Sequence, residues 1–223
     1  MFNSMVQEKV ALYQKPFKQY DEKVKQEVKE ILCRTPGIPV RDLRYSDLAL
    51  PSLSCHGIYV FCEGNNYHLR ELDPQTGTPR PLCDDENACV PWYIGSATGT
   101  SMVERIGAHF APRLKDFENI LLKHIAYSIA SNSDKPKIWL KPAVLGDQTN
   151  RIEKILAKAL PIIMDLELKV VFFKEITDEA LKKDIQKLES ALIRDVKPAF
   201  NYPKRFGNRQ FIIVDNQNQT VKS

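Results

Sequence analysis

The chain has 223 residues, of which 43% are hydrophobic and 27% charged, and its formal net charge is +4. This length suffices for one elaborated hydrophobic core, and the mild positive charge permits an anionic partner without requiring one. No apolar run approaches membrane-spanning length and the N-terminus has no apolar leader, so we expect a cytoplasmic protein with no membrane partner. An odd number of cysteines, five, favours reduced thiols in that compartment.

The predicted elements begin with a helix at 17–33, where apolar residues recur at helical spacing until TPGIP ends it. Residues 40–56 are expected to be irregular, because Pro51 breaks any regular element. The stretches GIYVFCE and VPWYIGSA are predicted strands. They flank an acidic loop at 63–91 that is rich in proline and glycine.

A helix is predicted directly after the second strand. Ser101 and Glu104 form a capping-box pattern, and Pro112 disfavours helical geometry at the preceding residue. The later predicted elements are a helix at 113–131, an edge strand or loop at 137–145, a helix at 150–163, a strand at 166–176, a helix at 178–196 and a short strand at FIIV. This order indicates an α+β fold with insertions.

Three features of these elements suggest chemistry. Arg105 and His109 are four residues apart, so they share a helical face, which we expect to point away from the core. The pair could act together in a functional site, and the alternative is an ordinary solvated face. Glu189 borders the buried stripe of the last helix, where a carboxylate is costly unless it is paired, bound to a cation or able to reach water. The segment 196–214 has no acid and could hold phosphates or be an ordinary charged loop; its basic residues are Lys197, Lys204, Arg205 and Arg209.

Taken in order, these residues resemble the GIY-YIG nuclease family. The matching parts are GIY at 57–59, YIG at 93–95, Arg105 and His109 on the next helix, and ESALIRDVKPAFN, which begins at Glu189 and ends at Asn201. The gap between the two tripeptides is longer than the family usually has, and 127–165 looks like an insertion.

The resemblance implies an α+β fold with a small three-stranded, mainly antiparallel sheet flanked by helices. The implied organisation is an N-terminal helical extension at 1–50, a nuclease core at 51–214 and a C-terminal tail at 215–223. The insertions into the core are at about 63–91 and 127–165.

Members of the family hydrolyse DNA phosphodiester bonds with one divalent ion, Mg²⁺ or Mn²⁺, per active site. By motif position, Glu189 is the sole protein ligand of that ion, which prefers oxygen ligands and keeps several waters. The Arg105 guanidinium stabilises charge that grows on the phosphate oxygens. Asn201 holds the loops of the active site, or Glu189 itself, by hydrogen bonds.

The sequence leaves open which residue is the general base. Tyr59 accepts a proton from the attacking water in the family's mechanism, with Tyr93 side by side with it on the paired strand. A free phenol has a pKa of about 10, so Tyr59 needs help from Arg105 and the ion, with His109 taking the proton. The rival assignment makes His109 the base and leaves Tyr59 to orient the water.

The chain contains no zinc-finger pattern and no helix-hairpin-helix signature, which favours a type II restriction-like endonuclease acting on double-stranded DNA. A homodimer would supply two sites for a double-strand break. The inserted segment would add phosphate contacts through Lys135, Lys137 and Lys141. The alternatives are a structure-specific repair or recombination nuclease and a catalytically silent DNA-binding module.

Overall fold

The fold is built around three antiparallel strands that the sequence predicts. Strand β3 (Gly57–Cys62) lies between β5 (Pro91–Ala97) and β6 (Glu167–Phe173) and is antiparallel to both. The computed structural model describes residues 10–13, 15, 17–43, 56–71, 80–84, 89–99, 101–110, 121–131, 149–173, 178–201 and 211–221.

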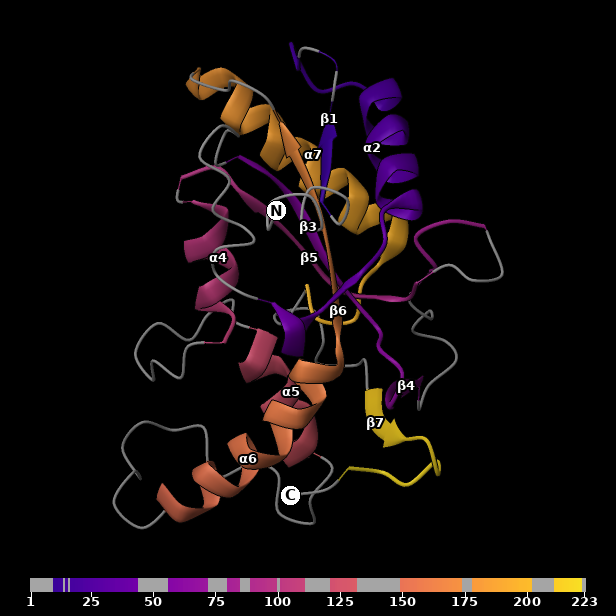
Figure 1. Cartoon of the computed structure of the whole chain (residues 1–223), viewed down its shortest axis with the longest axis vertical. Coiled ribbons are helices and arrows are strands. Elements are labelled where there is room, and N and C mark those ends of the chain that lie inside the picture. The colour runs from indigo at the N-terminus through magenta and orange to yellow at the C-terminus, as the bar shows by residue number, and fades with distance from the viewer. Residues whose placement is uncertain are drawn as a thin grey trace, which may run out of the picture.

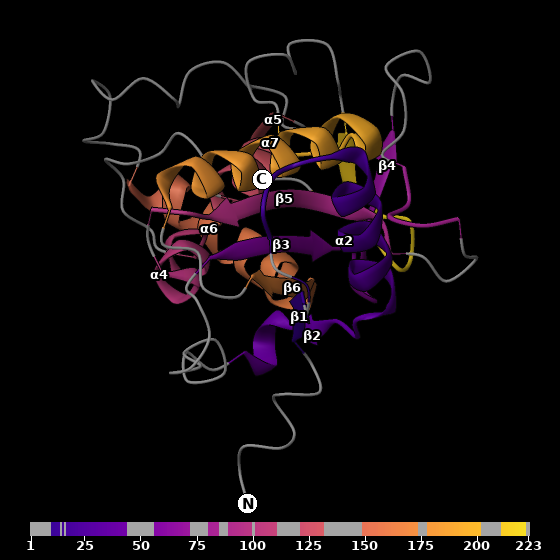
Figure 2. The ribbon, with the colours of Figure 1, turned by 90° about the horizontal axis from the view of Figure 1, so that it is seen from above.

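Two very short strands extend this sheet beyond the three that were predicted. Strand β1 (Ala11–Tyr13) pairs parallel with β6, and β2 (Ile38–Pro39) pairs antiparallel with it, so the mixed sheet has five strands. The sheet therefore has two more strands than the three that were expected. Segments of two or three residues carry no measurable alternation, so sequence periodicity does not detect them. The sheet order β1-β6-β3-β5 leaves β5 at one edge (Figure 2).

Side chains alternate between the two faces along the buried strands, so each face is apolar and is covered by helices. On one face, Ile58 and Val60 pack with α2 (Glu22–Arg34) and α7 (Glu179–Val196), which lie side by side in Figure 1. On the other face, Tyr59 and Phe61 pack with α4 (Met102–Ala108), α5 (Leu121–Ser131) and α6 (Thr149–Asp165). The molecule is thus a three-layer α+β fold.

Most helix boundaries follow the predicted end signals, but α2 begins at Glu22, after the cap Asp21, and not at residue 17 as expected. Ser101 and Glu104 form both hydrogen bonds of the capping box at the start of α4. At the start of α7, the side chain of Asp178 accepts a hydrogen bond from the N–H of Ala180. Lys197 ends α7 in the left-handed conformation, with φ of 52°. The predicted segments 113–120 and 137–145 lie outside the described residues.

A second, two-stranded sheet joins the 63–91 segment to the C-terminal end of the chain. Strand β4 (Tyr67–Glu71) pairs antiparallel with β7 (Phe211–Asp215), and Thr220 bridges back to Val214. The expectation that 63–91 is wholly loop is wrong at β4. A lone five-residue strand is marginal by itself. Its partner β7 matches the predicted strand FIIV, but it lies some 140 residues further along the chain, and local sequence does not show that the two segments pair.

Helices α5 and α6 belong to the core, although 127–165 resembles an insertion. They pack against each other, and Ile129, Ile155 and Ile162 are fully or almost fully buried. None of the helices in the described ranges combines the length and apolarity that a bilayer crossing requires.

A disulfide joins Cys33 at the end of α2 to Cys83, with their Cα atoms 6.1 Å apart. The expectation of five reduced thiols is wrong for this pair, whereas Cys62 and Cys89 are free. The two bonded cysteines are 50 residues apart in sequence. Leu82, next to Cys83, packs into the same core as α2, and sequence spacing alone does not show this contact.

Candidate active site

The two tyrosines of the motif lie side by side on the face of the sheet that α4 and α5 cover. Tyr59 is opposite Gly95 in the β3–β5 register, and Tyr93 is opposite Phe61. The rings of Tyr59 and Tyr93 are stacked, with centroids 6.3 Å apart and planes inclined by 23°. Tyr59 is completely buried and Tyr93 almost so. The pairing of two strands therefore brings together two phenols that are 34 residues apart in sequence.

Gly95 makes room for the ring of Tyr59. A Cβ atom at Gly95 would lie 2.3 Å from both Cζ and Oη of Tyr59, which is inside any van der Waals contact. The phenol thus rests directly on the backbone of β5. A glycine is required here for close approach.

Replacing Gly95 with alanine is expected to destabilise the protein by about 1–3 kcal/mol, the usual cost of overpacking a core. The ring of Tyr59 cannot yield cheaply, because it is buried and its hydroxyl is hydrogen-bonded to His109. Gly99→Ala is the matched control, since nothing lies within 4 Å of a Cβ there. Chemical denaturation of both variants tests this; equal midpoints would contradict the assigned role of Gly95.

His109 lies inside the protein, in contrast to the expected outward face. Its side chain is 1% exposed and packs against the rings of Tyr59, Phe61 and Tyr93, with centroid distances of 5.5, 5.4 and 4.8 Å. The expectation is wrong because the start of α5 covers that side of α4, where the N–H of Leu121 donates to His109 Nδ1 at 3.1 Å. Helical periodicity reports one buried face and does not reveal a second covering layer.

The two hydrogen bonds of His109 define its tautomer. Since Nδ1 accepts the Leu121 N–H, the proton of the neutral ring is on Nε2, which donates to the Tyr59 oxygen at 2.7 Å. Burial, and then the charge of Arg105, lower the pKa of His109 to about 3. The ring is therefore neutral near pH 7. It stabilises negative charge on the Tyr59 oxygen rather than accepting the proton of that phenol.

Burial also keeps both phenols protonated. It raises the pKa of Tyr59 well above 10.0 and that of Tyr93 to about 12. The positive charge of Arg105 acts in the opposite direction on both hydroxyls. Deprotonation of Tyr59 near neutral pH thus requires positive charge beyond that of Arg105.

Arg105 is half-buried on α4 and lies within electrostatic reach of Tyr59, Tyr93 and Glu189. Burial alone would lower the pKa of Arg105, but the phenols and the carboxylate more than offset this, and the net pKa is raised. Its guanidinium therefore stays charged and is available to an incoming anion.

Glu189 approaches from α7, on the opposite side of the sheet. The hydroxyl of Ser96 on β5 donates a hydrogen bond to Glu189 Oε2. Burial raises the pKa of Glu189, while the Ser96 hydrogen bond and the charge of Arg105 lower it in part. The carboxylate is thus held in place but incompletely compensated, which is the condition under which a bound cation stabilises it.

The site forms around the edge strand β5. Tyr59 and Tyr93 lie on the α4 side, whereas Ser96 and Glu189 lie on the α7 side. The carboxylate nevertheless acts on the pKa of both phenols and of Arg105. The carboxylate therefore lies within electrostatic reach of the two phenols and of the guanidinium.

Asn201 fixes the edge of β5 rather than Glu189. Its side-chain oxygen accepts the N–H of Ile94 at 2.7 Å, and its amide donates to the carbonyl of the same residue. The N–H of Phe200 donates to the carbonyl of Trp92 at 2.9 Å. Residues 200 and 201 thus satisfy the outward-facing backbone groups of an edge strand.

Asn201→Ala is expected to lower the free energy of unfolding by about 1–3 kcal/mol, because two partly buried backbone groups of Ile94 lose their partner. Asn201→Asp keeps the acceptor for the N–H of Ile94 but removes the donor to its carbonyl, so we expect a loss as well. Thermal melts of the three proteins measure this. Unchanged melting temperatures would show that water replaces the amide at no cost.

The predicted DNA-binding residues fall largely beyond what the structure describes. Lys197 is the one within it, and its backbone ends α7 with its N–H bonded to the carbonyl of Ile193. The others are outside the described residues: Lys135, Lys137, Lys141, Lys204, Arg205 and Arg209.

Sequence reasoning missed Ser96. It directly follows the tripeptide YIG and, because strand side chains alternate, faces α7 when Gly95 faces Tyr59. The sequence does contain a signal for this contact. A hydroxyl follows the tripeptide directly, and the last helix carries one glutamate at the border of its buried stripe.

The donor set fits a hard cation held by a single carboxylate. Within the described ranges, no group of three or more histidine, cysteine, aspartate or glutamate side chains is arranged to hold a metal ion. Glu189 with Ser96 offers carboxylate and hydroxyl oxygens only. Such a set suits Mg²⁺ or Mn²⁺, which retain water and take further oxygen ligands from a phosphate, and it does not suit a structural zinc ion.

Comparison with models of known protein families, with curated proteins and with solved structures gives no match to this chain.

Proposed function

We propose that this chain is a metal-dependent DNA endonuclease of the GIY-YIG type. The observation that carries the proposal is that one partly compensated carboxylate, one half-buried guanidinium and two stacked phenols lie within electrostatic reach of one another around strand β5. Glu189, Arg105, Tyr59 and Tyr93 come from four different elements. A packing role for any one of them does not explain why all of them meet.

The proposed chemistry is hydrolysis of a phosphodiester. Glu189 would hold a divalent cation, which polarises the scissile phosphate and stabilises the leaving oxygen. The Tyr59 phenolate, which the His109 Nε2–H donor stabilises, takes a proton from the attacking water and becomes the neutral phenol. Arg105 stabilises the charge on the phosphate oxygens. A bond forms between the water oxygen and phosphorus, the bond from phosphorus to the leaving sugar oxygen breaks, and that oxygen takes a proton from solvent.

The decisive experiment is incubation of the purified protein with supercoiled plasmid in Mg²⁺, in Mn²⁺ and in EDTA. We expect conversion to nicked and linear forms with either ion and none with EDTA. Uncut plasmid under every condition, with retained binding, would favour the catalytically silent DNA-binding module.

Within the proposed class, a type II restriction-like enzyme acting as a homodimer on double-stranded DNA is our preferred subtype. Sequencing the product ends tests it, because discrete fragments that share a motif indicate restriction. Cuts confined to branched or damaged DNA would instead indicate a repair or recombination nuclease. Light scattering with and without DNA tests the dimer, and a monomer in both states would contradict it.

A further inference from the structure

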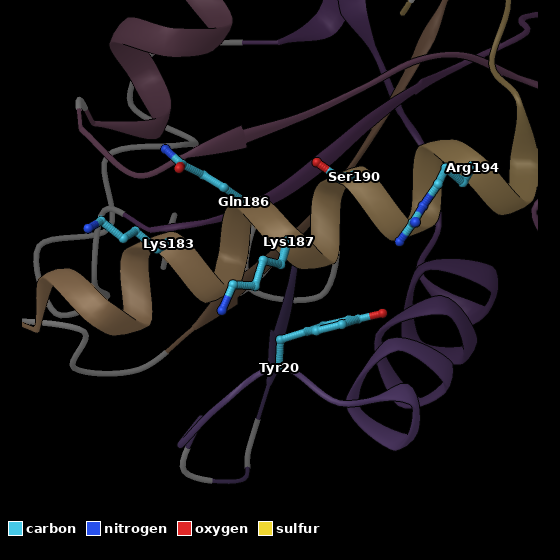
Figure 3. A pocket seen from close by; sticks show the side chains of 6 residues that line it. All are labelled: Tyr20, Lys183, Gln186, Lys187, Ser190 and Arg194. Carbon is cyan, nitrogen blue, oxygen red and sulfur yellow. The ribbon is translucent and has the colours of Figure 1, made fainter.

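An open groove of about 670 Å³ lies along the solvent-facing side of α7, away from the phenols. Figure 3 shows its side chains, of which all but Tyr20 come from α7. The lining consists of Tyr20, Lys183, Gln186, Lys187, Ser190 and Arg194. Every one of these side chains can donate a hydrogen bond, three are cationic and none is acidic.

The nearby acids are already occupied. Asp184 pairs with Lys187 at 2.6 Å and accepts the backbone N–H of Tyr20 at 3.0 Å. Glu22 accepts the hydroxyl of Tyr20 at 2.8 Å and pairs with Lys25 at 2.6 Å. Lys187 is therefore partly neutralised, which leaves Lys183 and Arg194 as the principal charges offered to a ligand.

The groove is joined rigidly to the candidate active site. Gln186 donates to the hydroxyl of Thr98 at 3.1 Å, two residues beyond the Ser96 that binds Glu189. Gln186 and Ser190 also flank Glu189 on the same helix. A ligand lying in the groove thus has a fixed position relative to the carboxylate.

The shape of the groove selects the class of ligand. Small-molecule sites are enclosed and mostly apolar, whereas this groove is open and each side chain that lines it carries a polar or charged group. Lys183 and Arg194 are separated by about 16 Å along the helix axis, from a rise of 1.5 Å per residue. A DNA strand carries a phosphate about every 3.4 Å along its axis, so an extended polyanion spans this distance and a single anion does not.

We infer that the α7 groove binds the phosphate backbone of the DNA beside the scissile bond, through Lys183 and Arg194. The inference rests on the proposed nuclease function for the identity of the polymer. It assigns contacts that position the duplex and carry no sequence information.

The test is the salt dependence of binding to a short labelled duplex without divalent metal, followed by fluorescence anisotropy. Each phosphate contact contributes about 0.9 to the slope of log K against log salt, so Lys183→Ala/Arg194→Ala should reduce that slope by about 2. The matched control is Lys18→Ala/Lys23→Ala, which removes two exposed lysines outside the groove. Lys183→Arg/Arg194→Lys keeps both charges and should keep the wild-type slope.

Asp184→Asn provides a variant with the opposite sign. It should free Lys187 while keeping an acceptor for the N–H of Tyr20, and so tighten binding. Circular dichroism confirms folding of all variants before they are compared. The inference is overturned if the groove variant and the control have the same slope of log K against log salt. It is also overturned if the groove variant loses affinity for polyglutamate but keeps its affinity for the duplex.

The two proposals fail separately. If the wild type cleaves DNA while the groove variants keep the full salt slope, the nuclease proposal stands and the groove proposal fails. If the wild type never cleaves DNA but binds the duplex with a salt slope that depends on Lys183 and Arg194, the groove proposal stands and the nuclease proposal fails.

Discussion

Glu189→Gln is expected to abolish DNA cleavage while leaving DNA binding measurable. The amide keeps the shape of the side chain and an acceptor for the Ser96 hydroxyl, but it lacks the charge that would hold a divalent cation. Lewis-acid assistance is worth several kcal/mol, and each 1.36 kcal/mol is tenfold in rate, so we expect a loss of at least about a thousandfold. Plasmid cleavage under single-turnover conditions measures it.

The same variant is expected to fold at least as stably as the wild type. Because folding raises the pKa of Glu189, its contribution to stability is present below its unfolded value, about 4.5, and is lost as pH rises through the folded value. Glutamine does not titrate. The difference in free energy of unfolding, variant minus wild type, should therefore increase with pH in the absence of metal.

Mg²⁺ separates this interpretation from a purely structural one. A ligand that binds only the folded state raises stability, so Mg²⁺ should raise the melting temperature of the wild type and not of Glu189→Gln. Glu179→Gln is the matched control, since Glu179 is an exposed glutamate of the same helix that pairs with Lys182. Full cleavage by Glu189→Gln would overturn the assignment of the metal ligand.

The elements that sequence predicted well are those whose signals are local. The capping box at Ser101, the end of α7 near Lys197 and the buried strand β6 each follow from a few adjacent residues. Strands β1, β2 and β4 were missed, since each depends on a partner far along the chain. Sequence patterns therefore recovered the central strands and not the full extent of the sheet.

The same distinction holds at the candidate site. Order along the chain was enough to select Tyr59, Glu189 and the residues between them. It did not show that His109 is buried or which of its nitrogens carries a proton, because both depend on the Leu121 N–H from another helix. The choice between two general bases was thus a question of tertiary hydrogen bonding.

Tyr59→Phe is expected to reduce the cleavage rate by about 10²–10⁴, the range for loss of a general base. The change removes one oxygen from a buried ring and leaves its packing over Gly95 intact. Tyr93→Phe is the matched control, because it removes a hydroxyl from the stacked neighbour without removing the acceptor of the His109 hydrogen bond. We expect a smaller loss for that variant.

The pH dependence of the wild-type rate separates the two candidate bases. Burial raises the pKa of Tyr59 well above 10.0 in the metal-free protein and a bound cation would lower it, so a rate that depends on its phenolate rises with pH through the neutral range. The pKa of His109 is about 3, so a rate that depends on neutral His109 is flat there. Both nitrogens of His109 are also already engaged, one as acceptor and one as donor.

His109→Gln completes the comparison. A glutamine amide can still donate toward the Tyr59 oxygen, so a donor role for residue 109 predicts partial activity with the rise in pH retained. A base role predicts loss as severe as that of Tyr59→Phe. A flat wild-type profile between about pH 6 and 9, together with an inactive His109→Gln and an active Tyr59→Phe, would transfer the role of base to His109.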